Sequence, residues 1–245
     1  MIPKIIHYCW FGGNAKPKEI EKYIQTWRSK LTGYKFIEWN EENFDIQNSI
    51  PYVKEAYEAK KFAFVSDYVR LHALNEYGGI YFDTDIEVLK SFDNFLQNEE
   101  LVLCRECRGA LSTAFIACCK NNAFISEFLD SYKDRHFIKQ DGQYDMSTIN
   151  EHMSQLAVDW GVDLQSDDVQ IVENSLAVYP YDYFSAFDVK NWHPVITENT
   201  CTVHHMTASW FSSNKKIVLI KFFQKLLGYN NYDRIKAWLD RQKES

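Results

Sequence analysis

Two aspartates that lie one residue apart, Asp83 and Asp85, follow the short apolar run 80–82. In an extended strand, side chains at positions i and i+2 point the same way, so these carboxylates can converge on one hard cation if the chain stays extended. A divalent ion held by few carboxylates keeps positions open for water and phosphate oxygens. Open α/β folds bind their ligands at the carboxyl edge of the sheet. The motif therefore predicts a site for a metal ion and a diphosphate.

A second pair of charged residues, Asp67 and Arg70, lies three residues apart on a predicted helix and therefore shares one face of it. A solvated ion pair on a helix contributes little to stability. This pair, however, follows the apolar stretch 62–65 together with Ser66, where a merely solvated pair is not expected. The residues alone leave both a functional and a structural role open.

The composition limits the class of protein. The chain has 245 residues, of which 46% are hydrophobic and 25% are charged, so one globular domain over 1–245 is expected. The net charge of -7 argues against a general nucleic-acid binder, because phosphate binding needs a basic face. Any bound phosphate is expected to be held through a metal.

The cysteines and the apolar runs indicate a compartment. Six cysteines occur without an apolar signal segment at the start of the chain, so a reduced, cytoplasmic setting is expected rather than a disulfide framework. The Cys104-x-x-Cys107 pair has no second such pair, which argues against a zinc site. No run approaches the roughly 18 consecutive apolar residues that a membrane-spanning helix requires.

Strands and helices alternate along the predicted pattern. Strands are expected at 2–11, 34–39, 80–82 (continued by 87–89), 101–104, 114–117 and 169–172. Helices are expected at 17–31, 51–61, 62–76, 122–135 and 148–160. This alternation predicts an α/β fold with a Rossmann-like, mostly parallel central sheet and helices on both faces. The Asp-x-Asp pair would then stand at the end of a strand.

Four blocks in this order resemble the DXD glycosyltransferases of family 32: residues 5–13, 66–70, 78–85 and 204–210. That family groups bacterial capsular polysaccharide transferases with fungal initiating mannosyltransferases, and it is similar to the catalytic domains of clostridial glucosylating toxins. The resemblance implies a GT-A fold, a nucleotide-sugar donor, an Mn²⁺ or Mg²⁺ ion, and transfer of a hexose to a glycan with retention at the anomeric carbon. Surface or capsular polysaccharide synthesis is the implied role. The alternative is a non-catalytic protein of the same fold that binds sugar nucleotides or glycans.

The resemblance also implies a site for the nucleotide. Trp10 resembles the aromatic residue that stacks on the donor base, with the backbone around Tyr8 and Phe11 at the edge of that base. This likeness favours a UDP-sugar, while the fungal branch of the family keeps GDP-mannose as the alternative.

Other residues match the positions that hold the sugar, the diphosphate and the metal. Asp67, next to Ser66, resembles the carboxylate that binds ribose or sugar hydroxyls, and Arg70 resembles the arginine at the donor sugar or its phosphate. Tyr81 would help to bind the diphosphate. By the same likeness, Asp83 would bind ribose and reach the metal through water, and Asp85 would ligate the metal directly.

The block that ends with Ser209 and Trp210 is the second half of the implied site. Trp210 resembles the tryptophan whose indole N–H donates to a diphosphate or glycosidic oxygen. In the toxin-like pattern an acidic residue lies five positions before this tryptophan and a serine two before it, but here those positions hold His205 and Ala208. Because imidazole can ligate Mn²⁺, His205 is the expected ligand and His204 its rival, with a purely structural role for both as the alternative.

The acceptor side of the site is less defined in the sequence. Asp145, in the segment 142–145 before a predicted helix, is a candidate for contact with the acceptor or the donor sugar, and a helix cap is the alternative.

Residues 214–245 form a C-terminal segment for which two placements are open. Lysines and bulky apolar residues alternate over 215–227, a composition typical of an interfacial helix on an anionic bilayer. Contact through 214–228 would suit a lipid-linked glycan acceptor and a cytoplasmic enzyme at the inner face of the membrane. The alternative is a terminal helix packed on the core. The sequence indicates no oligomeric state.

Overall fold

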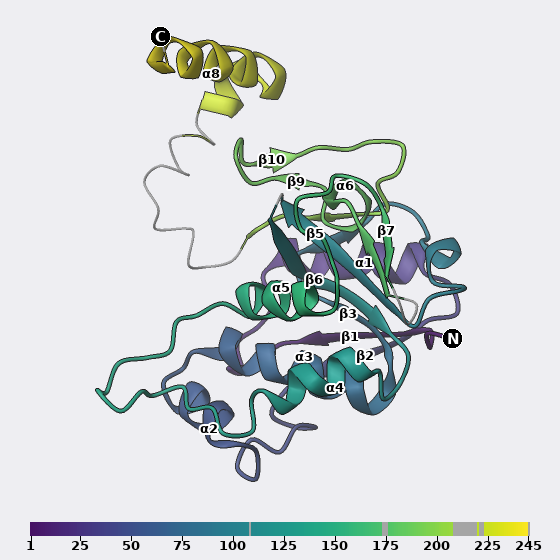
Figure 1. Cartoon of the computed structure of the whole chain (residues 1–245), viewed down its shortest axis with the longest axis vertical. Helices are drawn as coiled ribbons and strands as arrows, with labels where there is room; N and C mark the ends of the chain where they lie inside the picture. The colour runs from purple at the N-terminus through teal and green to yellow at the C-terminus, as the bar shows by residue number, and fades with distance from the viewer. Residues whose placement is uncertain (108, 173–175, 208–219, 221–222, 245) are drawn as a thin grey trace.

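The computed structural model describes residues 1–107, 109–172, 176–207, 220 and 223–244 (Figure 1). Its central sheet has seven strands: β1 (Ile5–Cys9), β2 (Lys35–Trp39), β3 (Gly79–Phe82), β5 (Leu101–Cys107), β6 (Ala110–Cys118), β7 (Gln170–Val172) and β8 (Leu176–Tyr179). The order across the sheet is β2-β1-β3-β6-β5-β8-β7. Only β6 and β7 run against the other five strands. The predicted α/β fold with a mostly parallel sheet is confirmed.

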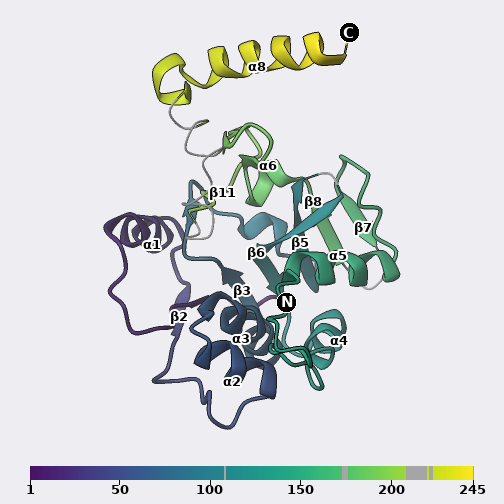
Figure 2. The same ribbon diagram turned by 90° about the vertical axis from the view of Figure 1, so that its left-hand side faces the viewer.

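Helices cover both faces of this sheet. They are α1 (Lys18–Lys30), α2 (Pro51–Glu58), α3 (Phe62–Tyr77), α4 (Ala123–Asp130), α5 (Ile149–Asp159), the short α6 (Tyr181–Phe184) and α8 (Tyr229–Glu244). Successive strand residues point to opposite faces, so Ile80 and Phe82 enter the core beneath α1 and α6, while Tyr81 enters the core beneath α2, α3, α4 and α5. Figure 2 shows α2, α3 and α4 gathered on one side of β3.

The helix that carries Asp67 and Arg70 is buried along most of its length. Its inward residues are nearly all apolar, and Asp67 and Arg70 are buried among them. The helix ends at Gly78, which has a φ of 63°. A side chain there would lie 2.6 Å from the backbone nitrogen of Lys120, so glycine is required where the chain turns into β3. This turn sets the distance between α3 and the Asp-x-Asp motif.

One predicted strand has a different partner from the one expected. The segment 87–89 was expected to continue the strand at 80–82, but β4 (Ile86–Val88) leaves the central sheet and pairs antiparallel with β11 (Thr202–His204). The strands β8, β9 (Phe187–Asp188), β10 (His193–Pro194) and β11 were not predicted. The pairing of β4 with β11 brings the C-terminal histidines beside the Asp-x-Asp motif, because it joins two segments more than 100 residues apart.

The C-terminal helix α8 lies at one end of the molecule, beyond the β9–β10 hairpin (Figures 1 and 2). It is held there by polar contacts: Asp233 pairs with Nε2 of His193 at 2.7 Å, and Lys236 donates to the backbone oxygen of Lys190 at 2.6 Å. The side chains of Ile235 and Trp238 are exposed. Among the described helices, none is long and apolar enough to cross a membrane. Most of the predicted contact segment 214–228 lies outside the described residues.

Candidate active site

The Asp-x-Asp motif forms a turn directly after β3. The backbone N–H of Ile86 donates to the backbone oxygen of Asp83 at 3.1 Å, and Asp83 N–H donates to the oxygen of Ala114 at 3.0 Å. The expectation of an extended strand through both aspartates is therefore wrong, because the chain bends between them. Their convergence is nevertheless found: one ligand atom each from Asp83, Asp85 and His204 lies within 4.8 Å of the others.

His204 and Asp85 form the buried part of this cluster. Nε2 of His204 lies 3.3 Å from one carboxylate oxygen of Asp85, and the other oxygen accepts from the N–H and hydroxyl of Thr207 at 2.7 and 3.1 Å. Burial opposes the charge on both side chains, but the attraction of His204 and the hydrogen bonds from Thr207 lower the pKa of Asp85. Burial alone would lower the pKa of His204, yet Asp85 raises it to about 9. Without a metal, the pair is a buried ion pair.

The histidine next in sequence points elsewhere. Nε2 of His205 lies 2.8 Å from Glu87, and its ring stacks on Tyr23 with a centroid distance of 4.4 Å. Only its backbone touches the motif, where its N–H donates to the oxygen of Asp85 at 3.1 Å. The sequence favoured His205 as the metal ligand, with His204 as its rival. The geometry instead favours His204 for this role. The reason is that neighbouring residues at the end of β11 face opposite ways.

Arg70 connects α3 to the motif. Its Nη2 lies 2.8 Å from Asp67 and 3.4 Å from Asp83, and its Nη1 donates to the backbone oxygen of Thr113 at 2.7 Å. Its guanidinium carbon lies 4.6 Å from the centre of the Tyr81 ring. Tyr81 is buried. Its ring therefore contributes to the site by packing against the guanidinium of Arg70. The remaining nitrogen of Arg70, Nε, is buried and has no hydrogen-bond partner among the described residues.

Asp67 is buried beside two charged groups that shift its pKa in opposite directions. Burial raises the pKa of Asp67 to about 6, and the charge of Asp83 adds to this rise, whereas Arg70 opposes it. Ser66 donates to the backbone oxygen of Phe62 at 3.0 Å, within its own helix. The structure thus brings Asp67, Arg70, Asp83 and Asp85 together, and Ser66 does not join their contacts.

The nucleotide-binding residues predicted near the first strand divide into two groups. Trp10 lines a cavity of about 530 Å³ together with Gly12, Gly13 and Lys16. Tyr8 is instead packed edge-on against Trp27 in the core, and Phe11 packs against Phe44. Of the three predicted residues, only Trp10 lines this cavity.

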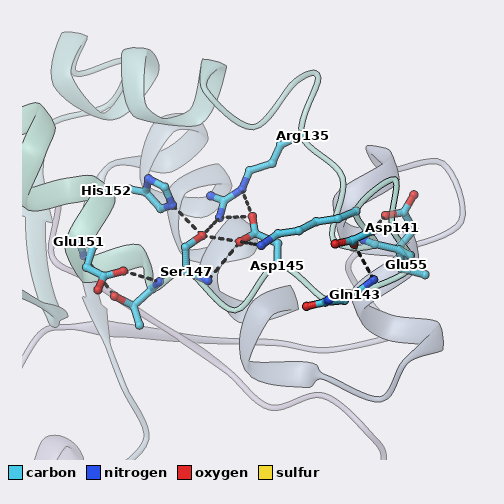
Figure 3. Close-up of polar contacts among 11 residues, drawn as sticks. Glu55, Arg135, Asp141, Gln143, Asp145, Ser147, Glu151 and His152 are labelled. Carbon is cyan, nitrogen blue, oxygen red and sulfur yellow. Dashed lines mark hydrogen bonds and ion pairs between the residues drawn. The ribbon is translucent and has the colours of Figure 1, made fainter.

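Asp145 lies in a separate polar cluster before α5 (Figure 3). One of its oxygens accepts from Nε and Nη2 of Arg135 at 2.9 and 2.7 Å, and the other accepts from the N–H and hydroxyl of Ser147 at 3.1 and 2.6 Å. The cap of α5 is Thr148, which forms a capping box with Glu151. Asp145 is therefore not the cap, and both its oxygens are already occupied by protein groups.

A comparison with known families identifies the region around the motif. Residues 17–102 match the family described as "Glycosyltransferase sugar-binding region containing DXD motif". The matched segment holds the turn with Asp83 and Asp85 as well as the pair Asp67 and Arg70. The match covers 86 of the 245 residues. The predicted resemblance to the DXD glycosyltransferases is confirmed.

An individual enzyme is also similar to this chain. The "Initiation-specific alpha-1,6-mannosyltransferase" of Candida albicans is 31% identical over 118 residues, which is 44% of this chain. The match spans 31% of that enzyme's length.

Two solved glycosyltransferase structures are similar at low identity. The PaToxG glycosyltransferase is 21% identical with a TM-score of 0.49, over 64% of this chain and 69% of that chain. The glycosyltransferase GlyE of Streptococcus pneumoniae is 10% identical with a TM-score of 0.47, over 99% of this chain and 64% of that chain.

Sequence reasoning missed the residues that hold the DXD cluster (Asp83, Asp85 and His204) in place. Thr113 contributes its backbone oxygen, and Thr207 contributes its backbone N–H and its hydroxyl. Backbone groups are not revealed by any pattern of side chains. Ser209 and Trp210, which the resemblance assigns to the diphosphate, lie outside the described residues.

Proposed function

We propose that the chain is a metal-dependent, retaining glycosyltransferase that moves a hexose from a nucleotide sugar to a glycan acceptor. The observation that carries this proposal is the convergence of Asp83, Asp85 and His204 at the carboxyl end of β3, with the buried guanidinium of Arg70 beside Asp83. Carboxylates can hold a divalent metal ion, and the metal ion together with the guanidinium of Arg70 can bind an anionic substrate such as a diphosphate.

The residues of the cluster fit a divalent cation. Carboxylate oxygens and an imidazole nitrogen are ligands that Mn²⁺ accepts, and Asp83 is partly exposed, with a side chain that is 29% accessible. Asp85 and His204 would be direct ligands, and Asp83 would complete the set. A bound cation would act as a Lewis acid and neutralise charge on the diphosphate leaving group. His204 must give up its proton to act as a ligand.

The donor is proposed from the residues around the cavity and from the relatives. Trp10 would stack on the base, and the likeness at this position favours UDP over GDP. The mannosyltransferase relative supports a hexose donor and keeps GDP-mannose as the alternative. Asp67 and Arg70 would hold the sugar hydroxyls and the phosphate, and Ser209 and Trp210 the diphosphate.

The acceptor is proposed to be a glycan of a surface or capsular polysaccharide, either free or linked to a lipid. Residues 214–245 hold eight lysines and arginines against three acidic residues, whereas residues 1–213 hold nineteen against thirty-one. This separation of charge, together with the exposed Ile235 and Trp238 on α8, favours contact of the C-terminal segment with an anionic membrane surface.

A thermal-shift panel tests the donor and the metal together. UDP, GDP and their common sugar conjugates are each added with and without Mn²⁺, because a ligand that binds only the folded state raises the melting temperature. We expect a shift with one nucleotide class that disappears with EDTA and in Asp85→Asn. A shift that does not depend on metal would contradict a metal-dependent transferase and favour the alternative, a binding protein of the same fold.

A further inference from the structure

A third carboxylate, Glu106, stands at the same edge of the sheet as the DXD turn. It lies near the end of β5, which runs in the same direction as β3, so both strands deliver their carboxyl ends to this edge. Asp83 is level with Ala114 on β6, but the β5–β6 hairpin continues to Cys107 and Ala110. From Ala114 to Ala110 is four residues, so at about 3.3 Å per residue the hairpin extends roughly 13 Å past the motif and forms a wall beside it.

Glu106 is the extra residue of a β-bulge in this wall. Arg105 pairs with Leu111 and Cys107 pairs with Ala110, so Glu106 has no partner across the ladder. A bulge redirects the side chain that it contains, and bulges are common next to active sites for that reason. In a regular hairpin, the side chain of Glu106 would point to the face set by the alternation of side chains along the strand. The bulge allows it to point in another direction.

A chain of hydrogen bonds connects Glu106 to the DXD cluster. The side-chain amide of Asn150, at the start of α5, donates to Oε2 of Glu106 at 3.1 Å. Its oxygen accepts from the hydroxyl of Thr113 at 2.6 Å, and the backbone oxygen of Thr113 accepts from Arg70. Asn150 therefore fixes one oxygen of Glu106 relative to Arg70 and Asp83.

The second oxygen of Glu106 has no hydrogen-bond partner among the described residues, and the side chain is partly exposed. Glu106 also falls outside the group whose ligand atoms lie within 4.8 Å of one another, so it is not placed as a metal ligand. A clamped carboxylate with one open oxygen is suited to accept hydrogen bonds from hydroxyl groups.

We propose that Glu106 binds a hydroxyl group of a sugar in the active site, with Asn150 as the residue that positions it. This inference rests on the proposed glycosyltransferase function. The hydroxyl belongs either to the donor hexose or to the acceptor glycan, and the two sources share the same chemistry. In either case the wall formed by β5 and β6 is the sugar-binding side of the site, opposite the cavity at Trp10.

The test uses the full chain and the nucleotide that raises the melting temperature in the panel above. In Glu106→Gln we expect the affinity for that nucleoside diphosphate with Mn²⁺ to stay within about twofold, because the proposal assigns Glu106 to the sugar and Glu106 lies outside the group of candidate metal ligands. Transfer should fall by about 10- to 100-fold, the effect of losing a hydrogen bond to a charged group. Glu76→Gln is the matched control, since Glu76 is exposed at the far end of α3.

Two further measurements separate the sources of the hydroxyl. If the donor hexose is bound, Glu106→Gln binds the nucleotide sugar no better than the nucleoside diphosphate, and slow hydrolysis of the donor falls as well. If the acceptor is bound, affinity for the nucleotide sugar and donor hydrolysis are retained, and the KM for the acceptor rises.

The outcomes that overturn the inference differ from those that overturn the function. Transfer and hydrolysis both unchanged in Glu106→Gln, or a loss of nucleotide binding with Mn²⁺, would refute the role of Glu106. If the wild-type protein binds no nucleotide with Mn²⁺, the proposed function itself is refuted. Should Glu106→Gln unfold, Glu106→Asp, which keeps the charge but withdraws it by one methylene, should show the same split between binding and transfer.

Discussion

Two polar clusters in this protein contain similar residue types but differ in what their oxygens contact. Around Asp145, both carboxylate oxygens are occupied by Arg135 and Ser147 at hydrogen-bond distance (Figure 3). At the DXD turn, the carboxylate of Asp83 has a single ion-pair contact among the described residues, at 3.4 Å to Arg70, and accepts no hydrogen bond from them. The first cluster is complete as it stands, and the second has capacity to bind something else.

This difference teaches how a functional carboxylate can be told from a structural one. Asp145 makes all its hydrogen bonds to protein groups and stabilises the fold. Asp85 is also bonded on both oxygens, but one of its partners, His204, can itself ligate a metal, and the neighbouring Asp83 carboxylate is not fully bonded. A group of carboxylates that faces one point with few partners is unfavourable without a cation. The following predictions test this distinction, from the largest expected effect to the smallest.

The largest effect is expected for Asp85→Asn in the DXD cluster. The rate of transfer should fall by at least about 100-fold, because a ligand to the charge-neutralising cation is lost. The free energy of unfolding should change by no more than about 2 kcal/mol, since the loss of the His204 pairing is offset by reduced repulsion from Asp83. Initial rates and urea denaturation measure the two effects. A variant that loses folding as strongly as activity would contradict the comparison.

For Asp145→Asn the expected effect is on stability and not on the rate of transfer. Losing part of a mostly buried, fully bonded ion pair should lower the free energy of unfolding by about 2 kcal/mol. Transfer per folded molecule should stay within about twofold of wild type. Urea denaturation and initial rates at a temperature where the variant is folded give both numbers. A large loss of rate in the folded variant would show that Asp145 contacts a substrate after all.

The two histidines are expected to differ in the same way, since His204 faces the proposed metal site and His205 contacts Glu87. His204→Ala should weaken Mn²⁺ binding by at least about tenfold, a loss that is seen even for outer-shell partners of a metal. His205→Ala removes a contact with Glu87 and should leave Mn²⁺ affinity within about threefold. Calorimetric titration with Mn²⁺ measures both variants. Equal losses in the two would show that the pairing of β4 and β11 is not what selects the ligand.

The pH dependence of the metal-free protein is set by His204. Its pKa in the folded protein, about 9, lies above the ordinary value of 6.5. Its pairing with Asp85 therefore contributes stability fully below about pH 6.5, and this contribution is lost as the pH rises through about 9. Urea denaturation in EDTA at several pH values from 6 to 10 should show this decline. The decline should be absent in His204→Gln, and a decline that persists there would assign it to another group.

The smallest effect on catalysis is expected at α8, which lies away from both clusters. Trp238→Ser combined with Ile235→Ser should reduce flotation of the full chain with phosphatidylserine vesicles, because exposed apolar area is lost. The rate with a water-soluble acceptor should stay within about twofold. Asn231→Ser is the control, since it changes an exposed polar residue of the same helix. Failure of the wild-type protein to float would refute the membrane contact.

Much of the frame was predictable because it rests on local patterns. The apolar periods placed β1, β2, β3 and the helices α1 to α5 close to their observed bounds, since burial selects those periods within each element. That Asp67 and Arg70 lie near the DXD motif was also predictable. The two residues form a polar pair in a mostly apolar helix, and this helix leads directly into the strand before the motif. Trp10 beside the cavity follows from the same first block.

The sequence by itself therefore determined the α/β class, the order of the elements and the carboxylates that could bind a cation. Only the tertiary structure decided which histidine joins them, that Asp83 and Asp85 meet through a turn, and that Asp145 is consumed by Arg135. The choice of histidine depends on the pairing of β4 with β11, which joins residues more than 100 positions apart, so no local pattern of residue types specifies it. The turn at the motif and the Arg135–Asp145 pair are shorter in range, but they depend on how the folded chain places each side chain.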